Sequence, residues 1–203
     1  MMTTGQELDI AGEAMRRMYE DPFWDARFGE RGRKFALPDG LYHLGYLDAA
    51  LTAGDAGVLV KYALWLRSVL IPRGVCSFHL SENLARIGEV LAERGLDPDG
   101  RSRRFLNQAC ESLRYAGGFD EAQVAREAAL LFPAGAHELR VLVAYASDAL
   151  AANDPELFRR HLAWALPWYE QRGLDSAALL SALRAPLATA SPLAAKMVAP
   201  VHS

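Results

Sequence analysis

Apolar residues recur along this chain at the spacing that places side chains on one face of an α-helix. Residues 5–19 show this pattern, and Thr4 with Glu7 predicts a capping box at their start. Further helices are predicted over residues 40–53, 56–71, 78–94, 101–116, 120–131, 136–152, 155–172 and 175–185. No run alternates with the period of a β-strand between turn residues. We therefore expect an all-α fold of eight to nine helices.

The helical pattern breaks over residues 23–40, which we expect to form a loop. The break follows Pro22 and contains Gly29 and Gly32, and the segment mixes cations with aromatic rings. Its cations are Arg27, Arg31, Arg33 and Lys34, and its rings are Trp24, Phe28 and Phe35. Such a loop can bind an anionic planar ligand, with guanidinium groups on carboxylates and rings on the ligand face. It can equally be a surface loop whose arginines pair with Asp21, Asp25 and Glu30.

An internal repeat is the most informative feature of the sequence. Between Tyr46 and Leu84, 11 residues are identical to the residue 99 positions later, without a gap. The pairs include Tyr46 with Tyr145 and Trp65 with Trp164. We interpret residues 41–87 as one copy of a helical module. Each copy has an apolar face, and we expect the copies to bury these faces on one another in one bundle.

The repeat and a turn signal at residues 97–100 predict the division of the chain. The expected parts are an N-terminal half at 1–96, a C-terminal half at 97–186 and a flexible tail at 187–203.

Composition and charge narrow the range of partners. The formal charge of −3 gives no electrostatic footprint for nucleic acid. No apolar run reaches the roughly 18 residues of a membrane span, and the first residues lack the pattern of a signal peptide. Two cysteines, Cys76 and Cys110, form no disulfide framework, so we expect a reducing, cytoplasmic compartment.

Most catalytic signatures are missing from the sequence. We find no zinc-protease or di-iron motif, no phosphate-binding glycine loop and no nucleophile elbow. Cys76 and His79 have the spacing CxxH, but one such pair supplies only two of the four ligands of a structural zinc site. We place His79 on the polar, solvated side of its helix. A non-catalytic protein is the favoured interpretation.

His161 is the strongest candidate for binding a ligand or a metal. In the helix that begins at Pro155 it shares a stripe with Phe158 and Trp168, and it lies one turn from Trp164. An imidazole among apolar and aromatic groups can hold a haem iron or a planar ligand. The alternative is a core histidine that is hydrogen-bonded to a backbone carbonyl or an acid. His43, close to Tyr46, is a second candidate of the same kind.

The repeated stretch resembles a known helical family. The segment LRVLVAYASDALAANDPELFRRHLAWALPWYEQRGLDSAALLSAL is similar in pattern to helices E to G of phycobiliproteins, which are globin-like. The resemblance implies a bound tetrapyrrole, but the Tyr-bearing helix lacks the cysteine that would attach a bilin covalently. The "AL-x-x-GD" junction of the first copy also resembles the helical cap of cobalamin-binding modules, although no Rossmann-like partner with its histidine motif follows.

Two hypotheses about function follow from the sequence. In the first, the protein is a non-catalytic sensor that binds haem or another tetrapyrrole through His161, with Arg27, Arg31 and Arg33 on the carboxylates. In the second, it binds no ligand and acts as an interaction or scaffold protein, with a homodimer as one form.

Overall fold

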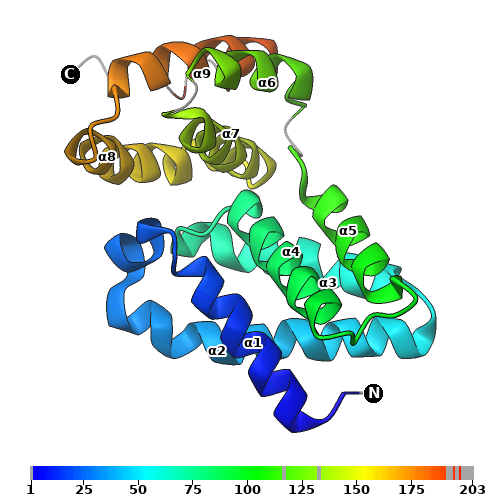
Figure 1. Cartoon of the computed structure of the whole chain (residues 1–203). Helices are drawn as coiled ribbons and strands as arrows, with labels where there is room; N and C mark the ends of the chain where they lie inside the picture. The colour runs from blue at the N-terminus through cyan, green and yellow to red at the C-terminus, as the bar shows by residue number, and fades with distance from the viewer. Residues whose placement is uncertain (1, 116–117, 132–133, 191–193, 195–196, 198–203) are drawn as a thin grey trace. The chain divides into compact units, whose positions relative to one another are not determined.

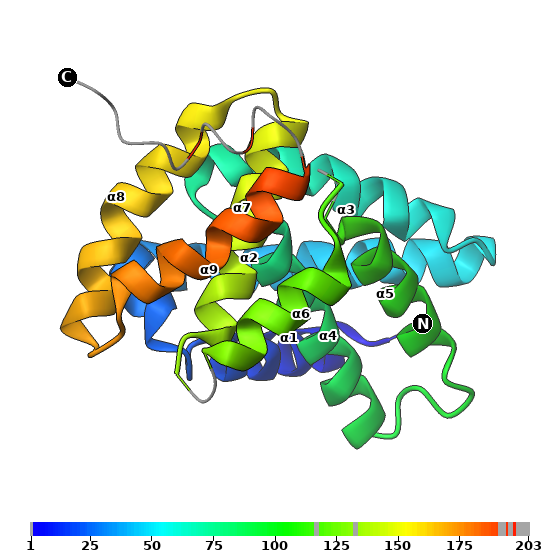
Figure 2. The same ribbon diagram turned by 90° about the horizontal axis from the view of Figure 1, so that it is seen from above.

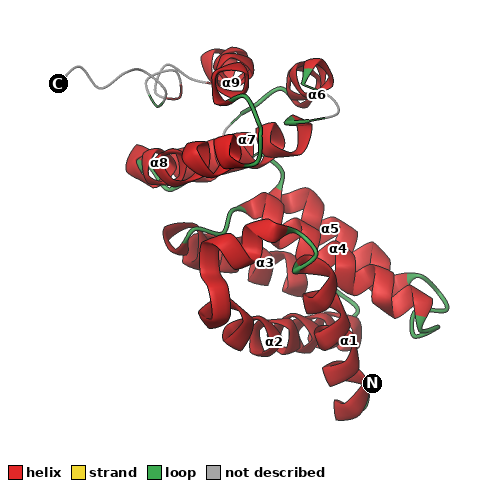
Figure 3. Ribbon diagram, turned by 60° about the vertical axis from the view of Figure 1, so that its left-hand side comes forward, coloured by secondary structure: helices red, strands yellow, loops and turns green. Residues whose placement is uncertain are grey.

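The fold is entirely helical in the part of the chain that the structure describes. The computed structural model describes residues 2–115, 118–131, 134–190, 194 and 197. The regular elements in these ranges are nine α-helices and one short 3₁₀-helix, η1, with no strand (Figures 1 and 3). The predicted all-α fold class is confirmed. Most of the tail predicted at 187–203 lies outside the described residues.

Most helix boundaries fall within a few residues of their predicted positions. The first five elements are α1 (Thr4–Met18), α2 (Pro22–Ala53), α3 (Gly57–Leu70), η1 (Ile71–Arg73) and α4 (Ser77–Glu93). The others are α5 (Arg101–Leu113), α6 (Glu121–Leu130), α7 (Ala136–Ala151), α8 (Pro155–Gln171) and α9 (Ser176–Ala190). The capping box of α1 is formed by Thr3 and Gln6, one residue earlier than predicted.

The loop predicted over residues 23–40 is wrong, because this segment is the first half of α2. Asp21 caps the helix by accepting a hydrogen bond from Phe23 N–H at 2.9 Å, and Pro22 occupies the first turn. Gly29 has φ 52° and ψ −146°, a conformation that essentially only glycine adopts, and it kinks the helix. Gly29 therefore interrupts the helical geometry at one kink, and the segment is helical on both sides of it.

The described helices group into two compact units, and each unit combines segments from distant parts of the chain. Unit 1 contains residues 1–66 and 80–113, and unit 2 contains residues 67–79 and 114–203. The chain thus passes from one unit to the other within α3 and again within α4. These bounds differ from the expected division at residue 96, because residues 97–113 belong to unit 1 and residues 67–79 belong to unit 2.

Unit 1 is built around the contact between α1 and α2 (Figure 1). Ile10 of α1 and Leu44 and Leu47 of α2 are fully buried. A Cβ atom on Gly40 would lie 3.1 Å from the Cβ of Ala11, so the glycine lets the two helices approach closely.

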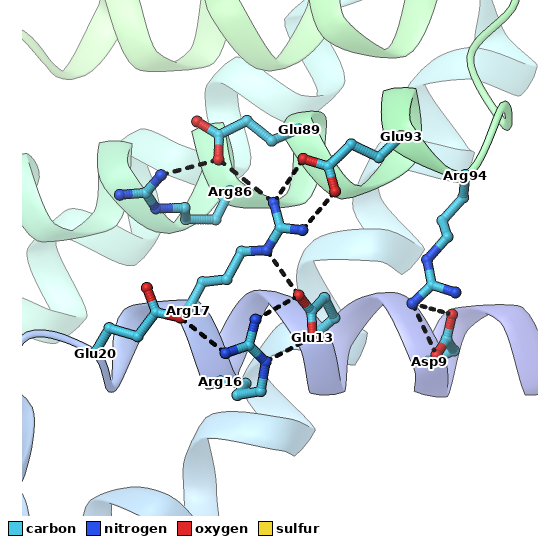
Figure 4. A network of polar contacts seen from close by, with 9 residues as sticks. All are labelled: Asp9, Glu13, Arg16, Arg17, Glu20, Arg86, Glu89, Glu93 and Arg94. Carbon is cyan, nitrogen blue, oxygen red and sulfur yellow. Dashed lines mark hydrogen bonds and ion pairs between the residues drawn. The ribbon is translucent and has the colours of Figure 1, made fainter.

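A network of ion pairs joins α1 to α4 within unit 1 (Figure 4). Arg17 lies at its centre, where Nε is 2.8 Å from Glu13 and Nη1 donates to Glu93 at 2.9 Å. Hydrogen bonds from Arg16 and Arg17 hold the pKa of Glu13 at about 2. A separate pair lies beside it, where Arg94 Nη2 is 3.2 Å from Asp9 (Figure 4). Arg17 and Glu13 are half-buried and their other partners are exposed, so we assign these ion pairs a positioning role for α1 and little stability.

Unit 2 is built around α7, which contacts α6, α8 and α9, and α9 crosses it in Figure 2. Every residue from Val141 to Ala149 is buried, so this part of the helix has no solvent-facing side. Two residues of the segment 67–79, Ile71 and Cys76, belong to the same core. A helix buried on all sides needs partners all round it, and this segment supplies one of them.

The turn that joins the first two helices of each repeat copy has the same hydrogen bonds in both copies. Asp55 and Asp154 donate their N–H groups to the carbonyl five residues earlier, at 3.1 and 2.9 Å. Their side chains accept from the N–H two residues later, at 2.7 and 3.1 Å. The residues before them, Gly54 and Asn153, both have positive φ, of 70° and 52°.

The second turn of each copy also matches at the 99-residue offset. Gly74 and Gly173 have φ values of 86° and 78°. The next residues, Val75 and Leu174, donate to the carbonyl five residues earlier at 3.2 and 3.0 Å. This agreement in backbone geometry supports the repeat that the sequence indicates.

No helix in the described ranges has both the length and the apolar character needed to cross a membrane.

Candidate functional site

The residues predicted to bind a ligand belong to different units. Phe158, His161, Trp164 and Trp168 lie on α8 in unit 2. His43, Tyr46, Arg27, Arg31 and Arg33 lie on α2 in unit 1. Each group is therefore described within its own unit.

His161 is buried in a stack of rings. Its ring lies 3.4 Å from that of Tyr145, centroid to centroid, with an interplanar angle of 11°. Trp164 lies at 6.0 Å, and Trp164 is itself stacked on Trp168 at 5.3 Å. Phe158 is fully buried one turn before His161. One face of the imidazole is thus covered by a tyrosine, as in a packed core.

His43 is buried beside a tyrosine of α3. Its Nδ1 lies 2.7 Å from Tyr62 Oη, a distance typical of a hydrogen bond. Burial lowers the pKa of His43 to about 4, so the ring is neutral near pH 7. Tyr46 stacks on Tyr62, with 3.8 Å between the ring centroids. His43 is therefore part of the packing of α2 against α3.

The ring stacks of the two copies have the same geometry. The rings of Tyr46 and Tyr62 are stacked at 14°, and those of Tyr145 and His161 at 11°. Tyr62 and His161 occupy the same place in the repeat, 99 residues apart. His161 therefore takes the position that a tyrosine fills in the first copy, which fits a packing role better than an open haem site.

Among the arginines of α2, Arg33 pairs with an acidic residue of the same helix. Arg33 donates from Nε to Asp25 at 2.8 Å, and its guanidinium lies 4.4 Å from the centre of the Tyr19 ring. Asp25 is the partner expected from the surface-loop interpretation, although the segment is helical. Arg31 is exposed and Arg27 is half-buried on the same helix.

A buried polar cluster on α7 was missed by the sequence reasoning. Tyr145 Oη donates a hydrogen bond to the Gly74 carbonyl, and the Asp148 carboxylate accepts one from Ser77 N–H at 2.6 Å. Arg67 Nε lies 3.9 Å from the same carboxylate. Burial raises the pKa of Asp148 to about 6, although the contacts with Ser77 and Arg67 oppose the shift. A buried aspartate on an apolar helix was the available signal.

The prediction that His79 is solvated is wrong. The side chain is 1% exposed, and its ring meets the edge of Tyr145 at 5.9 Å between centroids. Cys76 Sγ lies 3.5 Å from His79 Nδ1. Burial, with a smaller effect of His137, lowers the pKa of His79 to about 3. The polar neighbours in sequence did not reveal this, because the first turn of α4 packs against α7.

The segment 71–79, which we call the Gly74 turn, covers one face of α7. On that face Val141, Ala144, Tyr145 and Asp148 are all buried. Tyr145 is only 1% exposed, and its hydroxyl and ring contact Gly74 and His79 as described above.

The equivalent face of α2 is open. It consists of Tyr42, Gly45, Tyr46 and Ala49, and we call it the Tyr46 face. Tyr42 is 66% exposed and Tyr46 is 41% exposed. Beside it Trp65 of α3 is 57% exposed, with its ring 6.1 Å from that of Tyr62. Exposed aromatic groups of this kind mark interaction sites.

No group of three or more His, Cys, Asp or Glu side chains in the described ranges is arranged to hold a metal ion. No protein-family model, curated protein or solved structure matches this chain. The site must therefore be interpreted from its own geometry.

Proposed function

We propose that this protein is a non-catalytic interaction module that binds a protein segment on the Tyr46 face. The observation that carries the proposal is the contrast between α7 and α2. The same face of the repeat is covered by a turn and a helix start in the second copy and is exposed to solvent in the first. Tyr46 and Trp65 present large rings with a polar edge, which is the side-chain chemistry enriched at protein interfaces.

The contact on α7 indicates what kind of segment fits. Tyr145 pairs its hydroxyl with a turn carbonyl, while its ring packs beside the first turn of the following helix. Tyr46 has the same position in its helix and stacks on Tyr62 as Tyr145 stacks on His161. A partner with an exposed glycine turn before a helix would therefore suit Tyr46.

A photo-crosslinking amino acid placed at Tyr46 in the full chain, in living cells, tests this proposal. We expect a discrete crosslinked product whose attachment point on the partner maps to a turn or a helix start. The same amino acid at Leu130, which is 80% exposed on α6 in unit 2, is the matched control. Equal labelling from both positions, or no product from Tyr46, would refute the proposal.

Tetrapyrrole binding is a second candidate function. It is favoured by the buried imidazole of His161 beside Trp164, which is half-buried and stacked on Trp168. Haemin titration of the wild type and of His161→Tyr, which keeps a ring on Tyr145, tests it. A Soret shift present only in the wild type would support it, and a spectrum that is the same in both proteins would remove it.

We also propose a reducing, cytoplasmic location. Both cysteines take part in hydrogen-bond contacts as thiols, Cys76 with His79 at 3.5 Å and Cys110 with the Ser81 carbonyl at 3.4 Å. Thiols persist in such compartments.

A further inference from the structure

The second copy of the repeat carries a turn that matches the Gly74 turn but is largely exposed. This is the segment 170–178, which we call the Gly173 turn. Gly74 is buried, whereas Gly173 is exposed and has no atom within 4 Å of the place where a Cβ would be. The chain therefore has an open face in its first copy and an open turn in its second.

The geometry points to a second copy of this chain as the partner of the Tyr46 face. We propose that the Gly173 turn of one molecule docks on the Tyr46 face of the next, as the Gly74 turn docks on α7 within one molecule. This inference rests on the proposed interaction function and specifies its partner. The defining contact would be a hydrogen bond from Tyr46 Oη to the Gly173 carbonyl.

The side chains at the contact differ between the two copies. On the turn, Phe78 and His79 are replaced at the 99-residue offset by the smaller Ala177 and Ala178. On the helix face, Tyr42 is larger than its counterpart Val141, whereas Gly45 and Ala49 are smaller than theirs. The smaller side chains of the turn thus leave room for the ring of Tyr42 at this end of the face.

The two helix starts are capped differently. Asp148 accepts from Ser77 N–H at the start of α4, but its counterpart on α2 is Ala49, which cannot accept a hydrogen bond through its side chain. The start of α9 carries an acceptor of its own, because Asp175 Oδ1 accepts from Ala178 N–H at 3.0 Å. This cap lies within the turn and does not depend on the face that the turn contacts.

Such a contact joins two different surfaces, so it is head-to-tail and leaves one free surface at each end. Associations of this kind grow into rings or open chains. Repeat proteins usually end in polar capping repeats that prevent such growth. Here the aromatic Tyr46 face takes the place of a cap.

Sedimentation velocity on the full chain, from about 5 to about 500 µM, tests the proposal at the concentrations where weak interfaces form. We expect the wild type to form species larger than a dimer as concentration rises. Tyr46→Glu blocks the face, and Ala177→Arg, at an exposed position of α9, blocks the turn. We expect each variant alone to stay monomeric, with association weakened at least about tenfold, which is about 1.4 kcal/mol. Leu130→Glu, outside both surfaces, should associate like the wild type, and circular dichroism should show equal helix content in all four proteins.

The mixture of the two blocked variants is the decisive measurement. Tyr46→Glu keeps an intact turn and Ala177→Arg keeps an intact face, so an equimolar mixture should form dimers and nothing larger. A wild type that stays monomeric throughout, or a mixture without dimers, would overturn the proposal. A result in which Tyr46→Glu abolishes association while Ala177→Arg does not would also overturn it, because this would indicate that two Tyr46 faces pair. If the wild type is monomeric while Tyr46 crosslinks to another protein's turn, the proposed function stands and only the self-association fails.

Discussion

Three buried side chains, those of His43, His79 and Asp148, make the stability of the folded protein depend on pH. His43 and His79 have pKa values lowered to about 4 and about 3, so the folded protein binds fewer protons than the unfolded chain below pH 6.5. The folding free energy from these residues is therefore lost as the pH falls from about 6.5 towards 4. Asp148 acts in the opposite sense, because its pKa is raised to about 6 in the folded state. The pKa shifts of the two histidines are larger than that of Asp148, so the three residues together make the folded state less stable as the pH falls.

We predict that the free energy of unfolding falls by several kcal/mol between pH 6.5 and pH 4. A tenfold difference in proton affinity between the folded and unfolded states corresponds to about 1.4 kcal/mol. His79→Leu, which cannot be protonated, should reduce this loss, as measured by urea unfolding at each pH. If His79→Leu retains the full loss seen in the wild type, protonation of His79 is not its cause.

Asp148→Asn provides the counterpart with the opposite sign. The amide can still accept the hydrogen bond from Ser77 N–H, but it removes the proton uptake that favours the folded state between about pH 4 and pH 6. Between pH 6.5 and pH 4 the variant should lose about 2–3 kcal/mol more of its free energy of unfolding than the wild type. An unchanged loss in this variant would show that folding does not shift the pKa of Asp148, and a smaller loss would show that folding lowers it; either result would contradict the prediction.

At the scale of elements, α2 gives a test of its kink. Gly29 has positive φ, and a side chain there would be strained, so Gly29→Ala should lower the free energy of unfolding by about 1–3 kcal/mol. Gly45 lies in the regular part of the same helix with open space around it, so Gly45→Ala should raise stability by about 0.5–1 kcal/mol. Thermal unfolding of both variants measures the difference, and changes of equal sign would contradict this account.

The same helix shows what the sequence could and could not predict. The all-α fold and the helix starts at Asp154 and Ser77 were predictable, because caps, turns and periodicity are local signals. The first half of α2 was not, since the glycines and proline that normally end helices are accommodated there by one kink. The site was harder still. The burial of His79 and the role of Asp148 depend on the packing of the first turn of α4 against α7. The hydrogen bond between Ser77 and Asp148 in this contact joins residues that are 71 positions apart in the sequence.

At the scale of the whole molecule, the path of the chain matters more than the number of helices. Residues 67–79 belong to unit 2, although residues on both sides of them belong to unit 1. Within unit 2 this segment supplies Ile71 and Cys76 to the core and satisfies the hydroxyl of Tyr145 and the carboxylate of Asp148. A cut between residues 113 and 114 would separate the unit from this segment.

We therefore predict that a fragment of residues 114–203 does not fold cooperatively by itself. Without the Gly74 turn, the apolar side chains on one face of α7 are exposed to water, and Tyr145 and Asp148 lose hydrogen bonds that contribute about 1 kcal/mol each. The fragment should bind a hydrophobic dye and melt without a sharp transition. Residues 67–79 joined to residue 114 by a flexible linker of about 20 residues should restore a cooperative transition, because such a linker spans roughly 25 Å. Asp148→Ala in the linked fragment should weaken this rescue, since Ser77 N–H then lacks its acceptor. A cooperative transition in the unlinked fragment would show that α7 does not depend on the Gly74 turn. The contact on which the proposal for the Tyr46 face is based would then contribute little to stability.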